Sequence, residues 1–300
     1  MDDLTTTTVT DAVLAQMATT GNPRLREIMA SLVRHMHDFA RDVKLTPDEW
    51  LTAIGFLTRV GQKCTPARQE FILLSDVLGL SALVNLMHDQ AAEELGTTSS
   101  LLGPFYRNDA PEVPLGGSIV ADAKGHELLL YGRVTDNRGR AVPGALIQLW
   151  QTNAEGWYDL QVAGGAAMDM RGNIRCDANG AYHVRTVRPL GYSIPLDGPV
   201  GEMVRQQNRH GCRPAHIHFL IGAPGYRELV TALYLGDDPH IDSDTVFGVS
   251  GALVVAPVAH DPAAPIPGLP AIRYDFTLAR AAGAGSARVG ADPKEVLAAE

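Results

Sequence analysis

Cysteine is scarce in this chain, and the three residues present are scattered. Cys64, Cys176 and Cys212 are odd in number, and no two of them form a CxxC pair. Disulfide frameworks and thiolate zinc sites are built from paired cysteines at short, regular spacings. The sequence therefore argues against both, and it favours a reducing compartment, the cytoplasm.

Long apolar runs are also missing from the sequence. No run reaches the roughly eighteen consecutive apolar residues that a membrane-spanning helix needs. The stretch from Met1 to Leu4, followed by four threonines, has neither the basic start nor the apolar segment of a targeting sequence. We expect a soluble, unprocessed protein.

Basic residues are in the minority. The sequence has 25 Lys and Arg against 34 Asp and Glu, a formal net charge of −9, which is unlike the basic surface of a nucleic-acid-binding protein. Of its 300 residues, 45% are hydrophobic. That is enough to bury a substantial core, in one large domain or in two of ordinary size.

The first third of the chain, residues 9–95, has the periodicity of α-helices. From Pro23 to Val43, apolar residues recur at three- and four-residue steps and so form one face of a helix. This face consists of Leu25, Ile28, Met29, Leu32, Val33, Met36, Phe39 and Val43. Because the face is broad and apolar, it needs a partner surface.

Further helix starts follow this segment. Thr46-Pro47-Asp48-Glu49 combines an N-cap, a proline at the first helical position and the glutamate of a capping box. Thr65-Pro66 repeats the cap and the proline, and another helix is expected from Ser81 to Leu95. We therefore predict a helical N-terminal region over residues 1–96.

The periodicity changes after Gly96. Residues 97–117 are predicted to form an ordered connection, and short β-patterned runs separated by turns then follow. The expected strands are residues 128–135, 145–152, 182–187, 216–221, 228–235, 245–255 and 272–276, with a hairpin turn at 136–139. This spacing favours an antiparallel β-sandwich over residues 97–278, and thus an α+β fold. Long loops are expected at 150–176 and 188–213, and a loosely held tail at 279–300.

One expected strand carries the pattern Arg213-Pro214-Ala215-His216-Ile217-His218-Phe219. Since side chains alternate along a strand, His216 and His218 lie on one face, about 7 Å apart along the backbone. Two imidazoles placed in this way can bind one metal ion, with metal–nitrogen bonds of about 2.1 Å. The alternative is that both are polar residues on a solvated strand face.

Which metal the two histidines would select depends on the remaining ligands. A carboxylate would complete a ferrous site, and a third histidine such as His210 would favour zinc. Tyrosine phenolates would select a harder and more highly charged ion, because a phenol with a pKa of about 10 ionises at neutral pH only when a strong Lewis acid binds it. Ferric iron meets that requirement. The candidate carboxylates are those of Asp159, Asp177, Asp197 and Glu202.

Five motifs occur in order along the chain. They are Gly103-Pro104-Phe105-Tyr106, Pro143-Gly144-Ala145 followed by Trp150-Gln151, Gly156-Trp157-Tyr158-Asp159, the run from Tyr192 to Pro199, and the pattern around His216 and His218. Together they resemble the intradiol ring-cleavage dioxygenases, over roughly residues 20–260. Within that family, the segments 70–76 and 242–247 are most similar to hydroxyquinol 1,2-dioxygenases.

The resemblance implies an iron enzyme. At the matching motif positions, Tyr158, Tyr192, His216 and His218 are the implied ligands of one non-haem Fe(III) per subunit. Tyr192 is also implied to take a proton from the substrate, and Arg213 to stabilise negative charge that develops on the ring. The implied reaction is cleavage of hydroxyquinol (benzene-1,2,4-triol) with O2, which yields 3-hydroxy-cis,cis-muconate or its keto form, maleylacetate.

Alternatives to this reaction stay open. One is a catechol 1,2-dioxygenase that forms cis,cis-muconate; another is a zinc metallohydrolase, and a third is a non-catalytic, metal-stabilised β-sandwich module. Fourteen residues after His218, where the catechol enzymes usually have Gln and the hydroxyquinol enzymes often have His, this chain has Ala232. This residue bears on the choice of substrate and not on the metal.

The resemblance also implies a substrate pocket. Asp76 is its most specific member, because a carboxylate facing the ring can accept a hydrogen bond from the third hydroxyl that catechol lacks; the alternative is a surface helix residue. The pocket is expected to consist of Leu73, Asp76, Leu101, Leu102, Gly103, Pro104, Phe105, Ile194, Pro195, Arg213 and Val246.

The helical N-terminal region resembles the family's dimerisation region. The resemblance implies a homodimer formed through these helices, with a phospholipid bound at the interface. The apolar helix face is compatible with this arrangement, and it would also serve an ordinary core.

Overall fold

The computed structural model describes residues 3–65, 68–90, 96–121, 124–162 and 168–281. The chain divides into two compact units, residues 1–59 and 60–300, which are considered separately below. Several sequence predictions lie outside the described residues: the helix start at Pro66, the end of the helix at 91–95, and the tail from residue 282.

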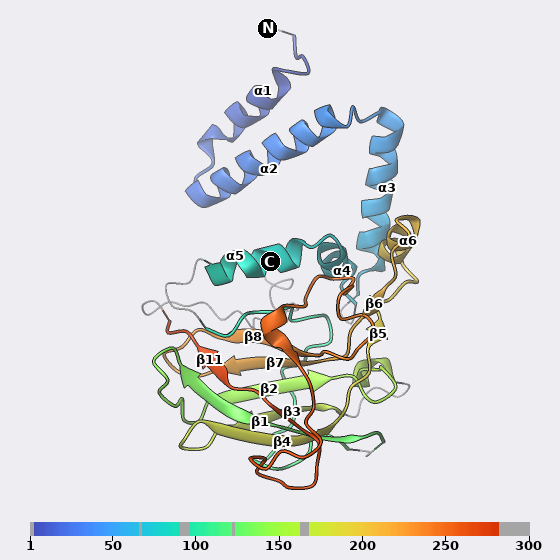
Figure 1. The fold of residues 1–300 in the computed structure, drawn as a ribbon. Coiled ribbons are helices and arrows are strands. Elements are labelled where there is room, and N and C mark those ends of the chain that lie inside the picture. The colour runs from blue at the N-terminus through green and yellow to red at the C-terminus, as the bar shows by residue number, and fades with distance from the viewer. Residues whose placement is uncertain (1–2, 66–67, 91–95, 122–123, 163–167, 282–300) are drawn as a thin grey trace. The chain divides into compact units, whose positions relative to one another are not determined.

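Helices form the first unit (Figure 1). Helix α1 (Val9–Gln16) leads through a 3-10 turn into α2 (Pro23–Asp42), and α3 (Pro47–Lys63) begins in this unit and ends in the next. The predicted capping box is confirmed, since the Glu49 carboxylate accepts a hydrogen bond from the Thr46 backbone N–H at 2.9 Å. The Thr46 hydroxyl accepts one from the Glu49 N–H at 3.3 Å.

The apolar face of α2 remains largely accessible. Val33 is the buried residue of this helix. Leu25, Ile28, Leu32, Met36 and Phe39 are between 46% and 57% exposed. A helix face with this many accessible apolar side chains needs a covering surface.

Two helices open the second unit. Helix α4 (Glu70–Val77) is followed by α5 (Leu80–Gln90). The Asn85 amide donates to the Ser100 carbonyl at 3.1 Å, and the Ser100 N–H donates to the Val230 carbonyl at 2.9 Å. Among the described residues no single helix is long and apolar enough to cross a membrane; only α4 and α5 taken as a pair, bent by 71°, meet that length and composition.

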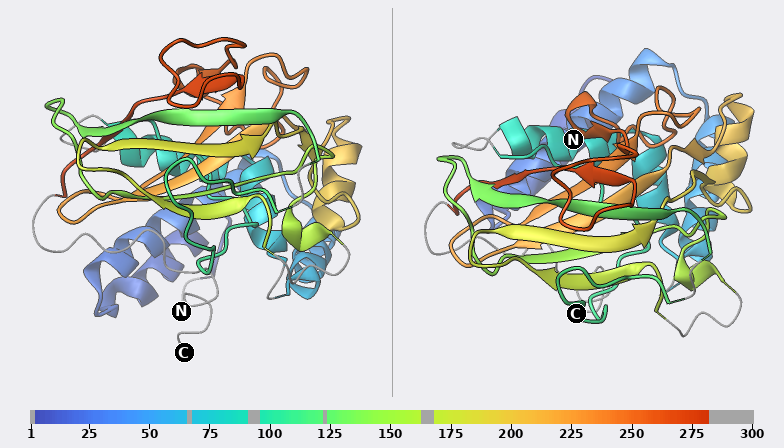
Figure 2. Two further views of the ribbon diagram at one scale, coloured as in Figure 1. Left: turned by 90° about the horizontal axis from the view of Figure 1, so that it is seen from below. Right: turned by 60° about the horizontal axis from the view of Figure 1, so that its bottom comes forward.

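Two sheets packed face to face make up most of this unit (Figure 2). The first has the order β3-β2-β7-β8-β9, formed by Arg171–Arg175, Leu146–Gln151, His216–Gly222, Leu229–Leu235 and Val254–Val255. In the second, β1 pairs with β4 on one side and with β10 and β11 on the other. These strands are Glu127–Asp136, Ala181–Val187, Ala271–Arg273 and Phe276–Leu278.

The predicted sandwich is confirmed, with one modification. The long strands pair antiparallel, whereas the short strands β10 and β11 pair parallel with β1, and β9 pairs parallel with β8. A further two-stranded sheet joins β5 (Tyr192–Ser193) to β6 (Cys212–Arg213).

The predicted turn at 136–139 is confirmed, but the long strands before and after it do not pair with each other. The turn exists, since the Asp136 N–H donates to the Arg140 carbonyl at 2.8 Å. However, β1 and β2 belong to different sheets. After a single bridge between Thr135 and Ala141, Gly144 adopts a φ of +67° and the chain crosses to the other layer.

Two predicted strands are shorter than expected. In segment 245–255 only β9 is a strand, because the Asp244 carboxylate accepts the N–H groups of Val246 and Gly248, which bends the backbone. The segment 272–276 is interrupted between β10 and β11, where the Asp275 carboxylate accepts the Arg133 N–H at 2.9 Å. In both places a side chain substitutes for a backbone partner of the sheet.

The two predicted long loops contain regular structure. Strand β3 lies within the first, and helix α6 (Pro199–Gln206) lies within the second. Helix α6 begins with proline at its first position, a start signal that the sequence interpretation did not use.

Strand β7 separates the core of the sandwich from a second buried cluster. Ile217, Phe219 and Ile221 point between the two sheets into the main core. Leu220, on the opposite face, packs with Trp150 and Tyr158 in a smaller cluster. His216, His218 and Leu220 are every second residue of the strand. Because side chains alternate between its two faces, both histidines lie with Leu220 on the face away from the main core.

Candidate active site

His216 and His218 form the centre of the candidate site. Both are buried, and their Nε2 atoms are 3.0 Å apart. The Nδ1 atom of His216 lies 2.6 Å from the Pro214 carbonyl, so Nδ1 carries the proton and Nε2 presents a lone pair. The imidazole of His218 is held by parallel stacking on Trp150, with ring centroids 4.9 Å apart.

Both imidazoles are neutral at physiological pH. Burial lowers the pKa of His216 well below 6.5, and the nearby Arg213 cation lowers it further. Burial also lowers the pKa of His218 well below that value, assisted by His216 and Arg213. Neutral imidazole is the form that binds metal ions.

The hydroxyl of Tyr158 lies beside the imidazole of His216. This side chain is buried, and its hydroxyl lies 3.3 Å from Nε2 of His216. Burial raises the pKa of Tyr158 well above 10, and the neighbouring Tyr192 raises it further. In this environment the phenol ionises only beside a strong positive charge.

Tyr192 approaches from the small sheet. Its ring centroid is 5.5 Å from that of Tyr158 and 5.8 Å from that of His216. Strand β5 places it directly opposite Arg213 on β6. Unlike Tyr158, it is only half-buried.

Arg213 is the buried cation of the site. Its Nη1 atom is 3.2 Å from Nε2 of His216, and Nη2 is 3.4 Å from the Tyr234 hydroxyl. Asp244 pairs with it through two contacts of 3.1 and 3.3 Å. Although burial opposes the charge, Asp244 raises the pKa of Arg213 well above its usual range, so the cation persists.

A second buried ion pair supports Tyr158, and the sequence did not reveal it. Asp159, one of the carboxylates considered as a metal ligand, accepts a hydrogen bond from Nε of Arg171 at 2.6 Å and another from Nη2. Arg171 also donates to the Phe105 carbonyl at 3.1 Å. Phe105 in turn stacks on Tyr158, with centroids 4.3 Å apart.

The remaining alternative ligands are engaged elsewhere. Asp177 accepts backbone N–H groups in the turn before β4, and Asp197 binds Arg68 and Lys63. Glu202 lies on α6. His210 accepts a hydrogen bond from the Cys212 N–H at 3.1 Å and is exposed.

The donor set fits a hard, highly charged metal ion. Two ligands at right angles, with metal–nitrogen bonds of about 2.1 Å, are separated by about 3.0 Å, and the two Nε2 atoms show this separation. Two neutral imidazoles and the phenol of Tyr158 meet here, with the ring of Tyr192 close by and Arg213 as the charged neighbour. Phenolate oxygens favour ferric iron over zinc.

Several predicted pocket residues lie around these side chains. Asp76 is buried on α4. Burial raises its pKa, whereas Ser81 and Arg213 lower it, which places the carboxyl within the field of that cation. Gly103 has a φ of +72°, and a Cβ atom there would lie 3.5 Å from the His218 ring.

The other predicted pocket residues differ in burial. Leu73, Leu101, Ile194 and Val246 are buried, and Leu102 packs on the cluster of Trp150 and Tyr158. Pro195 is half-buried, whereas Pro104 is exposed. Their roles stay predictions.

Ala232 lies directly opposite His218 in the pairing of β7 and β8. It is fully buried. A methyl group therefore stands where a longer polar side chain would reach His218.

Comparison with known proteins defines the class. Residues 101–280 match the family described as Dioxygenase, and residues 22–96 match Catechol dioxygenase N terminus. The chain belongs to the intradiol ring-cleavage dioxygenase family, whose members are enzymes.

Individual relatives of known activity are similar to this chain over most of its length. The chain is 48% identical to the 6-chlorohydroxyquinol 1,2-dioxygenase of Cupriavidus pinatubonensis over 246 residues, which cover 82% of this chain and 89% of that protein. It is 45% identical to the hydroxyquinol 1,2-dioxygenase of Rhodococcus opacus, with 86% and 85% covered. The crystal structure of hydroxyquinol 1,2-dioxygenase from Pseudomonas putida DLL-E4 superposes with a TM-score of 0.84 at 44% identity, covering 92% of this chain and 99% of that one.

Proposed function

We propose that this chain is a hydroxyquinol 1,2-dioxygenase. It cleaves the ring between two adjacent hydroxyl-bearing carbons with O2 and forms 3-hydroxy-cis,cis-muconate, the enol of maleylacetate. The observation that carries the proposal is the convergence of His216, His218 and Tyr158 on one buried point beside Arg213. The relatives named for hydroxyquinol cleavage support the substrate.

Ferric iron is the cofactor of this proposal, one ion per subunit. Tyr158, Tyr192, His216 and His218 would hold it, through two phenolate oxygens and two Nε2 atoms. When bound, iron supplies a Lewis acid that binds the substrate diol in its ionised form and makes the ring reactive toward O2.

Tyr192 is assigned the proton transfer from the substrate. Its half-buried position gives it more freedom than the enclosed Tyr158. A phenolate at this position would be basic enough to accept the proton of a substrate hydroxyl. Tyr158 is instead fixed by its stacking with Phe105.

Arg213 is assigned the stabilisation of negative charge on the ring. It is buried, and Asp244 fixes the orientation of its guanidinium. A preorganised cation in a buried site stabilises developing charge without reorientation of solvent.

Asp76 is assigned recognition of the third hydroxyl. Its carboxyl is buried in the field of Arg213. A buried acceptor left without its donor is costly, so catechol would be disfavoured relative to hydroxyquinol.

Steady-state kinetics on both substrates test the assignment. We expect kcat/KM for hydroxyquinol to exceed that for catechol by about tenfold or more. Faster turnover of catechol would instead identify the chain as a catechol 1,2-dioxygenase. That outcome would leave the iron site of the proposal intact.

We also infer that the chain forms a homodimer through its helical region, residues 1–96, with residues 97–278 as the catalytic domain. The accessible face of α2 supports this inference, because apolar side chains such as Leu32 and Phe39 need a partner.

A phospholipid is the proposed occupant of any apolar space between the two helical regions. Light scattering tests the dimer, and mass spectrometry of an organic extract tests the lipid. We expect Leu32→Glu to yield monomers.

A further inference from the structure

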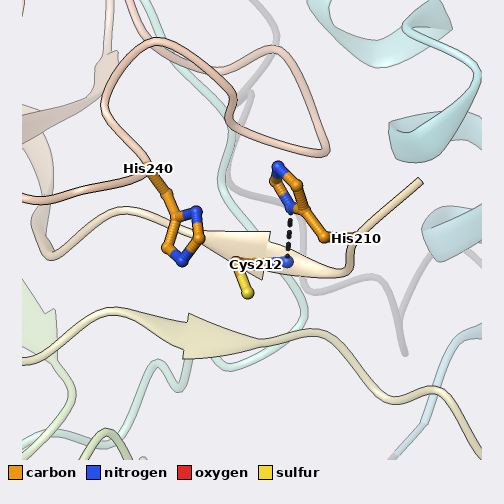
Figure 3. Close-up of side chains that lie close together, drawn as sticks. All are labelled: His210, Cys212 and His240. Atoms are coloured by element: carbon orange, nitrogen blue, oxygen red, sulfur yellow. Dashed lines mark hydrogen bonds between the residues drawn. The ribbon is translucent and has the colours of Figure 1, made fainter.

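A second cluster of metal-binding side chains lies outside the proposed iron site. His210, Cys212 and His240 each offer a ligand atom, and these atoms lie within 4.8 Å of one another (Figure 3). His210 precedes β6, Cys212 is the first residue of β6, and His240 lies in the segment after β8. Cysteine spacing alone gave no sign of this cluster, because two of its members are histidines and one comes from a distant segment.

We propose that these three side chains bind one zinc ion. Two imidazoles and one thiolate, with water in the fourth position, are a common tetrahedral ligand set for zinc. The soft thiolate favours zinc over ferric iron, in contrast to the phenolates of the proposed iron site. Uptake of zinc forms a zinc–sulfur bond, and the proton of the Cys212 thiol is released to water.

The geometry is close to a zinc site but more open. Tetrahedral ligands with bonds of about 2.0 to 2.3 Å are separated by about 3.4 to 3.8 Å, so ligand atoms up to 4.8 Å apart would have to move closer together. The members are accessible enough to do so: His210 is exposed, and Cys212 and His240 are half-buried. His210 also borders an open cavity of about 600 Å³, which gives an ion and its water ligand a path from solvent.

The cluster joins the two segments that position Arg213. Cys212 is adjacent to Arg213 in β6, and its carbonyl accepts the Thr245 N–H at 3.2 Å. The N–H of His240 donates to Asp238 at 2.9 Å, and the other oxygen of Asp238 accepts the Ala215 N–H at 2.9 Å. A zinc ion would therefore link β6 to the segment that continues to Asp244, the partner of Arg213. We expect the bound ion to stabilise this arrangement.

Zinc content after equilibration tests the proposal. The purified iron-containing protein is incubated with zinc chloride, freed of loosely bound metal with a weak chelator, and analysed for zinc and iron. We expect one zinc per chain that is lost in both Cys212→Ser and His240→Asn. Cys64→Ser, at the half-buried cysteine after α3, is the matched control and should keep its zinc.

Cobalt provides a second readout that does not depend on the iron site. Thiolate bound to Co²⁺ gives a charge-transfer absorption in the near ultraviolet, whereas the proposed iron ligands include no sulfur. The band should appear in the wild type and in Cys64→Ser, and should be absent from Cys212→Ser. The proposal is overturned if the wild type takes up no zinc, or if Cys212→Ser and His240→Asn retain it. Neither result depends on whether the chain cleaves hydroxyquinol.

Discussion

Arg213 and Asp244 form a buried ion pair that aims a cation at the histidines. Two contacts of 3.1 and 3.3 Å fix the guanidinium, and its Nη1 atom remains 3.2 Å from His216. A buried carboxylate beside a cation usually neutralises it, but here the Nη1 edge of the guanidinium still points toward His216. Positive charge is thereby available where a substrate ring would carry negative charge.

Replacing this cation should impair turnover more than binding. We expect Arg213→Lys to lower kcat by about 100-fold with a smaller change in KM, because lysine lacks the planar fork that contacts Asp244 and His216 together. Arg188→Lys is the control, since Arg188 pairs with Asp237 at the surface. An Arg213→Lys variant with wild-type kcat would exclude a role in the reaction.

Removal of the Tyr158 hydroxyl should change the colour of the protein. Phenolate bound to ferric iron absorbs visible light, so the iron-loaded wild type should be red, and Tyr158→Phe should lose or shift that absorption. Its kcat should fall by about two orders of magnitude. Tyr182→Phe removes another buried hydroxyl, one that donates to the Tyr274 carbonyl, and should leave the spectrum unchanged. A colourless wild type with full iron content would contradict the ligand assignment.

Substrate preference should depend on Asp76. We expect Asp76→Leu to lower kcat/KM for hydroxyquinol by about 100-fold and to change that for catechol by less than about threefold. Asp76→Asn keeps one acceptor oxygen, so its kcat/KM for hydroxyquinol should lie between those of the wild type and Asp76→Leu. Equal losses on both substrates would indicate that Asp76 maintains the fold and does not read the third hydroxyl.

Acid should abolish the contribution of Asp136 to stability. Arg140 lowers the pKa of Asp136 from 3.8 to about 2. Since the folded state binds this proton less readily than the unfolded state, the stabilisation is present above pH 3.8 and is lost as the pH falls through about 2. Melting temperatures of the wild type and Asp136→Asn should therefore differ at pH 7 and converge toward pH 2.

The control for this series is Asp42→Asn, at an exposed aspartate at the end of α2. Its melting temperature should follow that of the wild type throughout. If the difference in melting temperature between the wild type and Asp136→Asn does not change with pH, the ion pair with Arg140 is not the cause of that difference.

Alternation along β7 was a part of the site that the sequence could predict without any family resemblance. A strand with His216 and His218 at every second position must place both on one face, and the apolar residues between them then define the core side. Helix caps were equally local, as at Thr46 and Glu49. Such features depend on residues a few positions apart.

Contacts between distant segments that no motif carries were beyond sequence reasoning. Asp159 and Arg171 are 12 residues apart in the sequence, and neither residue alone signals that it pairs with the other behind Tyr158. The same holds for Cys212 and His240, which the return of the chain through β7 and β8 brings together. The crossing from β1 to the other sheet was missed because a turn signal does not specify which strand follows it.

Isotope labelling of the ring-opened product tests the central proposal most directly. Iron-loaded protein is supplied with hydroxyquinol under ¹⁸O₂, and the product is analysed by mass spectrometry against an enzyme-free control. The account predicts 3-hydroxy-cis,cis-muconate with one labelled oxygen in each of its two new carboxylates. An unlabelled quinone, or a product opened outside the pair of adjacent hydroxyl-bearing carbons, would contradict it.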